Sequence, residues 1–406
     1  MVEPSRAAHV GSARLAAVPK GVWALGFVSM FMDISSEMVH SLLPVFLVSV
    51  LGASVLTVGL IEGLAEATVA VTKLFSGTLS DYLGKRKLLA VVGYGVAALS
   101  KPVMPLAPSV AWVFGARVLD RMGKGIRGAP RDALVGDISP PHVRGAAYGL
   151  RQSLDTVGAF IGPLLAIAFM ALLAGDIRSV FWIAVIPAFI SVGILVVAVK
   201  EPQQRGEAAA RPQLRAADFR RLGRAYWSLL LVAVVFTFSR FSEAFLVLRA
   251  AHVGLSAGLV PLVLVVMSVA YAVSAYPAGR LSDRMDRYHL LAVGFATMVA
   301  ANVVLALAPG IASVLAGVAL WGLHMGLTQG LFAALVADTS PPRLRGTAFG
   351  VFNLATGIVV LAASLLAGWL WDLYGPTAAF ATGAGFASVA LALMLVVRRR
   401  TAADVA

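Results

Sequence analysis

Long apolar segments recur along the whole of this 406-residue chain, and they restrict its fold more than any other feature. Hydrophobic residues make up 59% of the sequence and charged residues only 13%, with a mean hydropathy of +0.87. An ordinary soluble domain is about 25% charged, and so apolar a chain would lack the polar residues to cover its surface. We therefore predict an all-α polytopic membrane protein.

A spanning helix needs about 20 apolar residues, and roughly twelve segments of the chain meet that length. They cover residues 22–50, 56–79, 88–107, 110–136, 146–173, 180–199, 226–250, 258–280, 290–308, 311–337, 347–372 and 378–397. The predicted organisation is a tail at 1–21, a six-helix bundle at 22–199, a polar linker at 200–225, a second six-helix bundle at 226–397 and a tail at 398–406.

The net charge of +13 is concentrated at alternate connections between these segments. This is the positive-inside pattern, which predicts a multi-pass protein of the inner or plasma membrane with both termini and the linker in the cytoplasm. The same distribution argues against a nucleic-acid partner. Cysteine is absent, so neither a disulfide nor a thiolate site is possible.

Two pairs of related stretches show that the two halves are repeats. GTLSDYLGKRKLLAV at Gly77 matches GRLSDRMDRYHLLAV at Gly279, and DISPPHVRGAAYG at Asp137 matches DTSPPRLRGTAFG at Asp338. Both pairs have nearly the same offset. A duplicated six-helix bundle is typical of transporters that bind their substrate between the halves near the bilayer midplane.

These motifs resemble those of the major facilitator superfamily over essentially the whole chain. GTLSDYLGKRK resembles the family's loop between helices 2 and 3, and GAFIGP (158–163) resembles the helix-5 motif of its proton-driven exporters. Arg117 matches the helix-4 arginine, whereas Asp120 and Arg121 depart from that motif, and Asp286 replaces a glycine in the second loop copy. The resemblance implies alternating access and proton-coupled efflux, in a branch distinguished by DRMGKGIRGAPRDAL on helix 4.

The GKGIRG string within that branch motif also fits a dinucleotide-binding loop. Such a loop must follow a strand and open a helix, but SVAWVFGARVLDR, which precedes it here, reads as a membrane helix. The sequence contains no HExxH motif, Walker loop or Ser/His/Asp grouping. We therefore expect neither an enzyme nor a bound cofactor.

Ionisable residues cost roughly 2.5–3.5 kcal/mol each inside a spanning helix, so they should face one another or water. The acids predicted to couple transport to protons or cations are Asp33, Glu37, Glu62, Glu66 and Asp155. Their predicted charge partners are Lys73, Arg117, Asp120, Arg121, Lys124 and Arg151. Structural ion pairing is the alternative role of these residues.

The resemblance implies two further functional groups. The gating loop comprises Gly77, Asp81, Gly84, Lys85, Arg86 and Lys87, with Asp283 in the second copy. The antiporter-type helix carries Gly158, Gly162 and Pro163. Topology-setting charge and simple helix packing are the respective alternatives.

The second half has fewer charges and more aromatic residues, and its predicted substrate-cavity residues are Phe241, Glu243, Asn302, His324, Gln329 and Asn353. Together the two halves favour a monomeric secondary transporter that exports a small amphipathic or cationic solute by proton antiport. Two alternatives remain open. One is a divalent-metal exporter using Asp33, Glu37 and His40, and the other is a non-transporting sensor or scaffold.

Overall fold

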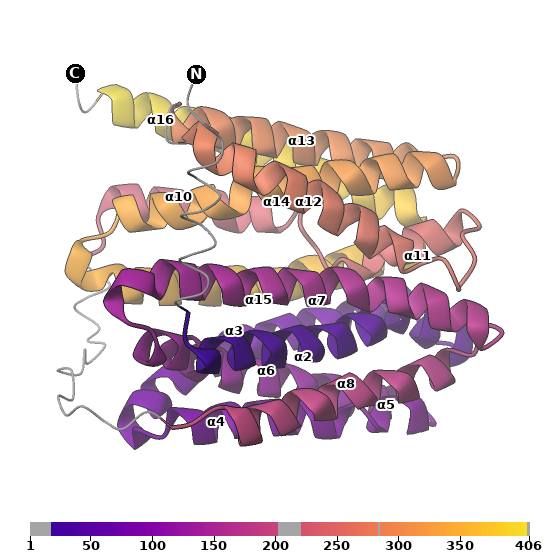
Figure 1. Ribbon diagram of the computed structural model, residues 1–406. Coiled ribbons are helices and arrows are strands. Elements are labelled where there is room, and N and C mark those ends of the chain that lie inside the picture. The colour runs from indigo at the N-terminus through magenta and orange to yellow at the C-terminus, as the bar shows by residue number, and fades with distance from the viewer. Residues whose placement is uncertain (1–17, 202–220, 283–284, 404–406) are drawn as a thin grey trace, which may run out of the picture. The chain divides into compact units, whose positions relative to one another are not determined.

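The computed structural model describes residues 18–201, 221–282 and 285–403, and its helices run roughly side by side within each compact part of the chain (Figure 1). The described residues form helices and turns, and none of them belongs to a strand. The predictions for residues 1–17, 202–220 and 404–406 lie outside this description.

Six spans come from the first half of the sequence. They are α2 (Lys20–Val45) continued by the π-helical η1 (Phe46–Val50), α3 (Val55–Leu83), α4 (Arg86–Ser100) followed by the short α5 (Val103–Leu106), α6 (Val110–Ile138), the 3₁₀ turn η2 (Pro141–Val143) with α7 (Arg144–Leu172), and α8 (Ile177–Ala198).

The second half supplies the other six spans. They are the pair α10 (Arg224–Thr237) and α11 (Ala244–His252), then α12 (Leu262–Ser282), α13 (Arg287–Leu307), α14 (Ile311–Asp338), the 3₁₀ turn η3 (Pro342–Leu344) with α15 (Arg345–Tyr374), and α16 (Pro376–Ala403).

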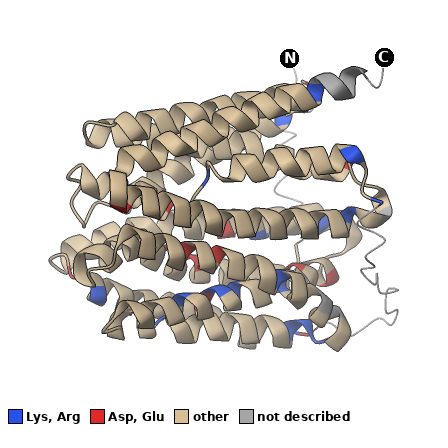
Figure 2. Ribbon diagram, turned by 180° about the vertical axis from the view of Figure 1, so that it is seen from behind, with Lys and Arg blue, Asp and Glu red and all other residues tan. Residues whose placement is uncertain are grey.

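Ten of these spans are long and apolar enough to cross a membrane on length and composition alone. The other two are α6, which carries many charged residues, and the interrupted pair α10–α11, whose first part is a shorter apolar helix. Ten and two give the predicted twelve, so the predicted fold class is confirmed. Figure 2 shows that most of the length of the helices carries no Lys, Arg, Asp or Glu.

Several helix ends are set by single residues in the short connections. Gly84 between α3 and α4 and Gly175 before α8 both adopt positive φ, which glycine tolerates at little cost. Asp176 caps α8 by accepting a hydrogen bond from Arg178 N at 3.0 Å. A second hydrogen bond, from Ser179 Oγ, together with that backbone bond lowers the pKa of the Asp176 carboxyl. Asp286 caps α13 in the same way, accepting from Tyr288 N at 2.9 Å.

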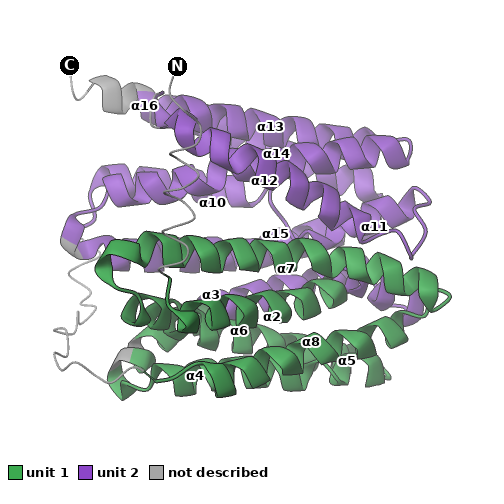
Figure 3. Cartoon of the chain, viewed as in Figure 1, with its two compact units in different colours: residues 1–40, 71–209 green, residues 41–70, 210–406 purple. Residues whose placement is uncertain are grey.

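The chain divides into two compact units, one of residues 1–40 with 71–209 and the other of residues 41–70 with 210–406 (Figure 3). The second unit therefore includes the first part of α3, and glycines explain why. A Cβ on Gly59 would lie 2.3 Å from Ser364 O, and one on Gly63 would lie 2.9 Å from Leu361 Cα. Only glycine lets α3 approach α15 so closely.

Each unit has its own core. In unit 1 a cluster of buried side chains joins α2, α4, α6, α7 and α8, and it includes the fully buried Tyr94. In unit 2 the core is aromatic. Phe236 and Phe295 stack with ring centroids 3.9 Å apart, and Phe241 packs against Trp321 and Phe380 at 5.7 and 5.3 Å. Aromatic pairs of this kind contribute more than their buried area alone.

Candidate functional site

Helix α6 places a row of charged side chains inside unit 1, where Arg117, Asp120, Arg121 and Arg127 are all buried. The helix can lie deep because it packs tightly on α4. A Cβ on Gly123 would lie only 2.5 Å from Gly93 O. This close approach turns the charged face of α6 toward polar groups of the neighbouring helices.

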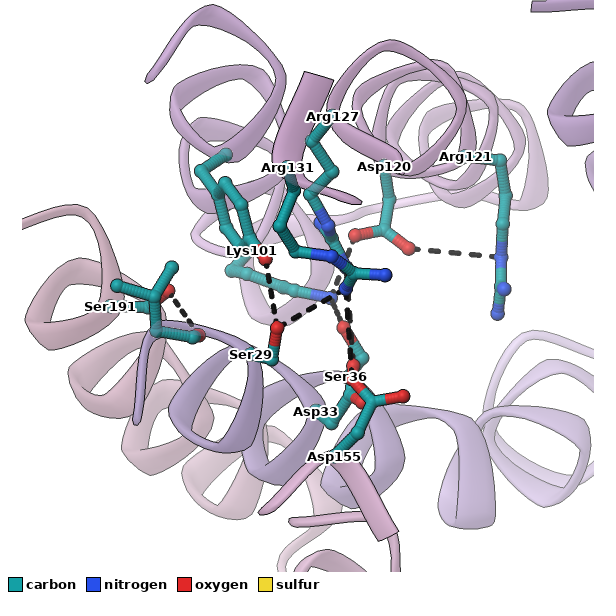
Figure 4. A network of polar contacts seen from close by, with 12 residues as sticks. Ser29, Asp33, Ser36, Lys101, Asp120, Arg121, Arg127, Arg131, Asp155 and Ser191 are labelled. Atoms are coloured by element: carbon teal, nitrogen blue, oxygen red, sulfur yellow. Dashed lines mark hydrogen bonds and ion pairs between the residues drawn. The ribbon is translucent and has the colours of Figure 1, made fainter. Parts of the chain in front are cut away.

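Asp120 is the acid at the centre of this row, and three bases surround it. Lys101 Nζ donates to Asp120 Oδ1 at 2.9 Å and to Ser36 Oγ at 3.1 Å. Arg117 Nη1 and Arg121 Nε both lie 3.8 Å from Asp120 Oδ2. Figure 4 shows Lys101 and Arg121 reaching Asp120 from different sides.

A second acid, Asp33 of α2, lies near Arg127, with Arg127 Nη2 at 4.0 Å from Asp33 Oδ1. The Arg127 guanidinium also lies over the Tyr94 ring, 4.6 Å from its centroid. Such a cation–π contact lowers the cost of keeping an arginine away from water. Asp155 of α7 lies beside Asp33 in the same polar network (Figure 4), where two ionised carboxylates would repel each other.

Asp155 of α7 is held by two arginines. Arg131 Nη1 lies 3.6 Å from Asp155 Oδ1, and Arg151 Nη1 lies 3.6 Å from Asp155 Oδ2. Arg131 Nη1 also donates to Ser29 Oγ on α2 at 3.2 Å. Asp33 and Asp155 thus lie together, pointing toward the arginines of α6 (Figure 4).

Gly158 and Gly162 allow α7 to bring Asp155 up to α2. A Cβ on Gly158 would lie 2.5 Å from Met30 O, and one on Gly162 would lie 2.7 Å from Glu37 Cβ. Pro163 is buried beside them inside the helix. The predicted antiporter-type residues therefore position one of the predicted coupling acids.

Glu37 lies one turn from Asp33 and pairs with His40, whose Nδ1 is 3.4 Å from Glu37 Oε2. Asp33 instead faces Arg127 and Asp155. Over the described ranges, no group of three or more His, Cys, Asp or Glu side chains is arranged to hold a metal ion. The Asp33, Glu37 and His40 trio therefore loses its support as a metal site.

The other predicted coupling residues lie on α3 and α6. Glu62 and Glu66 belong to the part of α3 that is grouped with unit 2. Glu62 is buried, whereas Lys73 and Lys124 are exposed. Lys124 still interacts electrostatically with both Asp33 and Glu37.

The gating-loop residues have a partner on α6 in unit 1. Arg86, the first residue of α4, pairs with Asp137 near the end of α6. In unit 2, Arg287 at the start of α13 pairs with Asp338 at the end of α14. Lys87 Nζ donates to Val196 O at 2.9 Å. The Asp81 side chain and all of Asp283 lie outside the description.

The predicted cavity residues of unit 2 fall into two groups. Phe241, Asn302 and His324 are buried, and Gln329 and Asn353 are exposed. Glu243 is partly buried at the start of α11. His324 lies edge-on to Trp321, with ring centroids 5.6 Å apart. Among the described residues neither ring nitrogen of His324 has a hydrogen-bond partner.

Sequence reasoning placed Arg131 on the basic face of α6 and noted Lys101 in its span, but it included neither of them, nor Arg127, among the predicted charge partners. Arg127 and Arg131 lie one turn apart on the predicted charged helix, and that spacing could have identified them as a second pair facing the acids. Lys101 lies at the end of its helix, directly before Pro102. A lone lysine in an apolar span is itself a signal of a functional site.

The model of the Major Facilitator Superfamily matches residues 25–250 and 229–405. The chain belongs to the major facilitator superfamily. The MFS-type transporter MJ1317 of Methanocaldococcus jannaschii is 32% identical over 388 residues, which cover 93% of this chain and 95% of that protein.

Two other superfamily comparisons are informative. The multidrug resistance protein MdtH of Yersinia pestis is 30% identical over 164 residues, covering 40% of this chain and 39% of that protein. The crystal structure of a POT family transporter in complex with a thioalcohol-conjugated peptide has a TM-score of 0.78 at 11% identity, covering 96% of this chain and 99% of that one. The second comparison shows a common fold. As a member of the superfamily with multiple apolar helices, the present chain is a multi-pass membrane transporter.

Proposed function

We propose that the protein is a monomeric secondary transporter of the cell membrane that exports a small amphipathic or cationic solute in exchange for protons. Both termini would lie in the cytoplasm, as the distribution of basic residues predicts. The solute would pass unchanged, without enzymatic conversion. Access would alternate between the two sides of the membrane by rocking of one repeat against the other.

The observation that carries this proposal is the position of Asp33 beside Asp155 among apolar helices (Figure 4). Two ionised carboxylates repel each other, so such a pair favours holding one proton between them. Arg127, Arg131 and Arg151 lie within 4.0 Å of one or other acid. Loss of the shared proton would be balanced by these arginines, which makes the pair a reversible proton carrier.

Exchange follows if proton and solute cannot occupy the transporter together. Release of the proton from the Asp33–Asp155 pair into the cytoplasm adds one negative charge, which favours binding of a cationic group. Proton uptake from outside removes that charge and favours release of the solute. Glu37, paired with His40, lies one turn away as a second acid on the same helix. Export is further supported by the name of the partly similar MdtH, a multidrug resistance protein.

Purified protein in proteoliposomes under an imposed pH gradient provides the test, with ethidium and rhodamine 6G as amphipathic cationic probes. We expect the wild type to move at least one probe against the proton flux. Asp33→Asn and Asp155→Asn should lower the proton-driven rate at least tenfold. Asp176→Asn, at an exposed helix cap outside the spans, is the matched control and should keep the wild-type rate. Lack of driven flux of both probes, or full activity of both carboxylate variants, would contradict the proposal.

A further inference from the structure

Lys101 is an unusual residue for the interior of an apolar span. Its side chain is only 2% exposed, and it lies fifteen residues beyond Arg86, the first residue of α4. At 1.5 Å per residue this places it about 22 Å along the helix axis from the basic loop. α4 ends at Ser100, just before it, and Pro102 follows, so the lysine lies at the interruption between α4 and α5.

The charges around Lys101 have an excess of bases. From α6 it faces Asp120 at 2.9 Å, and the same carboxylate also contacts Arg117 and Arg121 at 3.8 Å. Arginine keeps its proton in proteins, whereas a buried lysine can release one. Three neighbouring bases favour the ionised form of Asp120. Lys101 is thus the member of this group able to exchange a proton.

The other helices packed on this region supply few charges to Lys101. α2 offers the hydroxyl of Ser36 at 3.1 Å, while its acids are directed elsewhere, Asp33 toward Arg127 and Glu37 toward His40. Glu37 also interacts with Arg121. From α8, Arg178 donates to Pro105 O on α5 at 2.6 Å. Asp120 is therefore the acid that holds the lysine proton in place.

We infer that Lys101 is a second proton-binding site, separate from the Asp33–Asp155 pair, and that each transport cycle exchanges two protons for one solute. During each cycle the Lys101 ammonium loses one proton to water on the cytoplasmic side and becomes a neutral amine. The amine takes up one proton from the outer side and becomes an ammonium again. No other bond changes. The inference rests on the proposed proton exchange and adds its stoichiometry.

The stoichiometry has a direct electrical consequence. Exchange of two protons for one monovalent cation moves one net charge, so a membrane potential drives it, whereas exchange of one proton is electroneutral. At a pH difference of one unit and zero potential, the limiting accumulation is about 100-fold for two protons and about 10-fold for one, since each proton contributes a factor of ten.

Lys101→Arg tests the inference because arginine keeps the positive charge beside Asp120 but does not release a proton. Ethidium or rhodamine 6G accumulation is measured in proteoliposomes, with the pH gradient and a potassium–valinomycin potential varied independently. We expect potential-driven accumulation by the wild type. We expect Lys101→Arg to lose the response to potential, to retain the response to pH, and to accumulate about tenfold less probe at one pH unit.

A lysine with a purely structural role would leave the response to potential unchanged in Lys101→Arg, and that result would overturn the inference. A wild type that responds to pH but not to potential would also overturn it and would leave the proposed function intact. A wild type that responds to neither gradient contradicts the proposed function itself. If Lys101→Arg does not fold, the neutral pair Lys101→Gln with Asp120→Asn replaces it, with the same expected loss of response to potential.

Discussion

The carboxylate of Asp372 at the end of α15 accepts a hydrogen bond from the backbone N–H of Val55 at the start of α3, at 3.0 Å. Its other oxygen accepts from Leu56 N at 2.9 Å. The first N–H groups of a helix have no partner within the helix, and an acid there also complements the helix dipole. One side chain thus caps α3 although 317 residues separate it from Val55.

Removal of this cap should weaken unit 2. We expect Asp372→Ala to lower the free energy of unfolding by about 1 kcal/mol, the usual contribution of a helix cap. Thermal unfolding of the purified protein in detergent measures the change. Asp372→Asn should recover part of the loss because asparagine is also a capping residue. Equal stability of the alanine variant and the wild type would show that the cap contributes nothing.

The glycines of α7 give a second prediction. Gly158→Ala would place a methyl group 2.5 Å from the backbone oxygen of Met30, so α7 and α2 would have to separate. Overpacking of this kind costs about 1–3 kcal/mol and would move Asp155 away from Asp33. We expect a lower unfolding temperature and slower proton-driven flux.

Gly149→Ala is the matched control, because Gly149 lies on the same helix with no heavy atom within 4 Å of an added Cβ. Alanine favours helix more than glycine, so this variant should be at least as stable as the wild type. If both variants behaved alike, the close packing of α7 on α2 would be wrong.

The twelve spans could be predicted from the sequence because each one can be recognised by itself, from the length and composition of its own apolar segment. The exception in composition, α6, was still placed correctly, since its charges form a stripe on an otherwise apolar helix. Repeats with a common offset led to the prediction of two six-helix halves, and their exact bounds stay a prediction. The interruption between α10 and α11 was not predicted, because the residues that separate them, Phe238 to Glu243, are largely compatible with a continuous helix.

Pairing within the site was harder to predict. Helical periodicity placed Asp33, Arg117, Asp120 and Asp155 on inward faces, but it does not determine which helices meet. Those contacts depend on glycines at the crossings, such as Gly123 against α4. Periodicity also placed Glu62 with the first-half acids, and that grouping stays a prediction.

Asp120 should be essential to the stability of unit 1. Asp120→Asn removes the negative charge facing Lys101, Arg117 and Arg121, and breaking a buried ion pair in this way costs about 3–5 kcal/mol. Replacing both members of the closest pair, as Lys101→Met with Asp120→Leu, removes one base as well and should cost less than Asp120→Asn alone. Thermal unfolding of the three proteins tests this order, and the reverse order would show that Lys101 and Asp120 are not coupled.

The repeated arginine–aspartate pair gives the final prediction. Arg86 with Asp137, and Arg287 with Asp338, each join the start of one span to the end of the next span, and all four side chains are partly exposed. Partly exposed pairs contribute about 0–1 kcal/mol, so Arg86→Asp should hardly change the unfolding temperature. If the pair orders the loop for gating, the same variant should slow probe flux severalfold, and the swap Arg86→Asp with Asp137→Arg should restore it. The rates are measured in proteoliposomes at low and high salt, since salt screens such pairs. A swap that remains as slow as the single variant would mean that Arg86 acts through something other than its charge on Asp137.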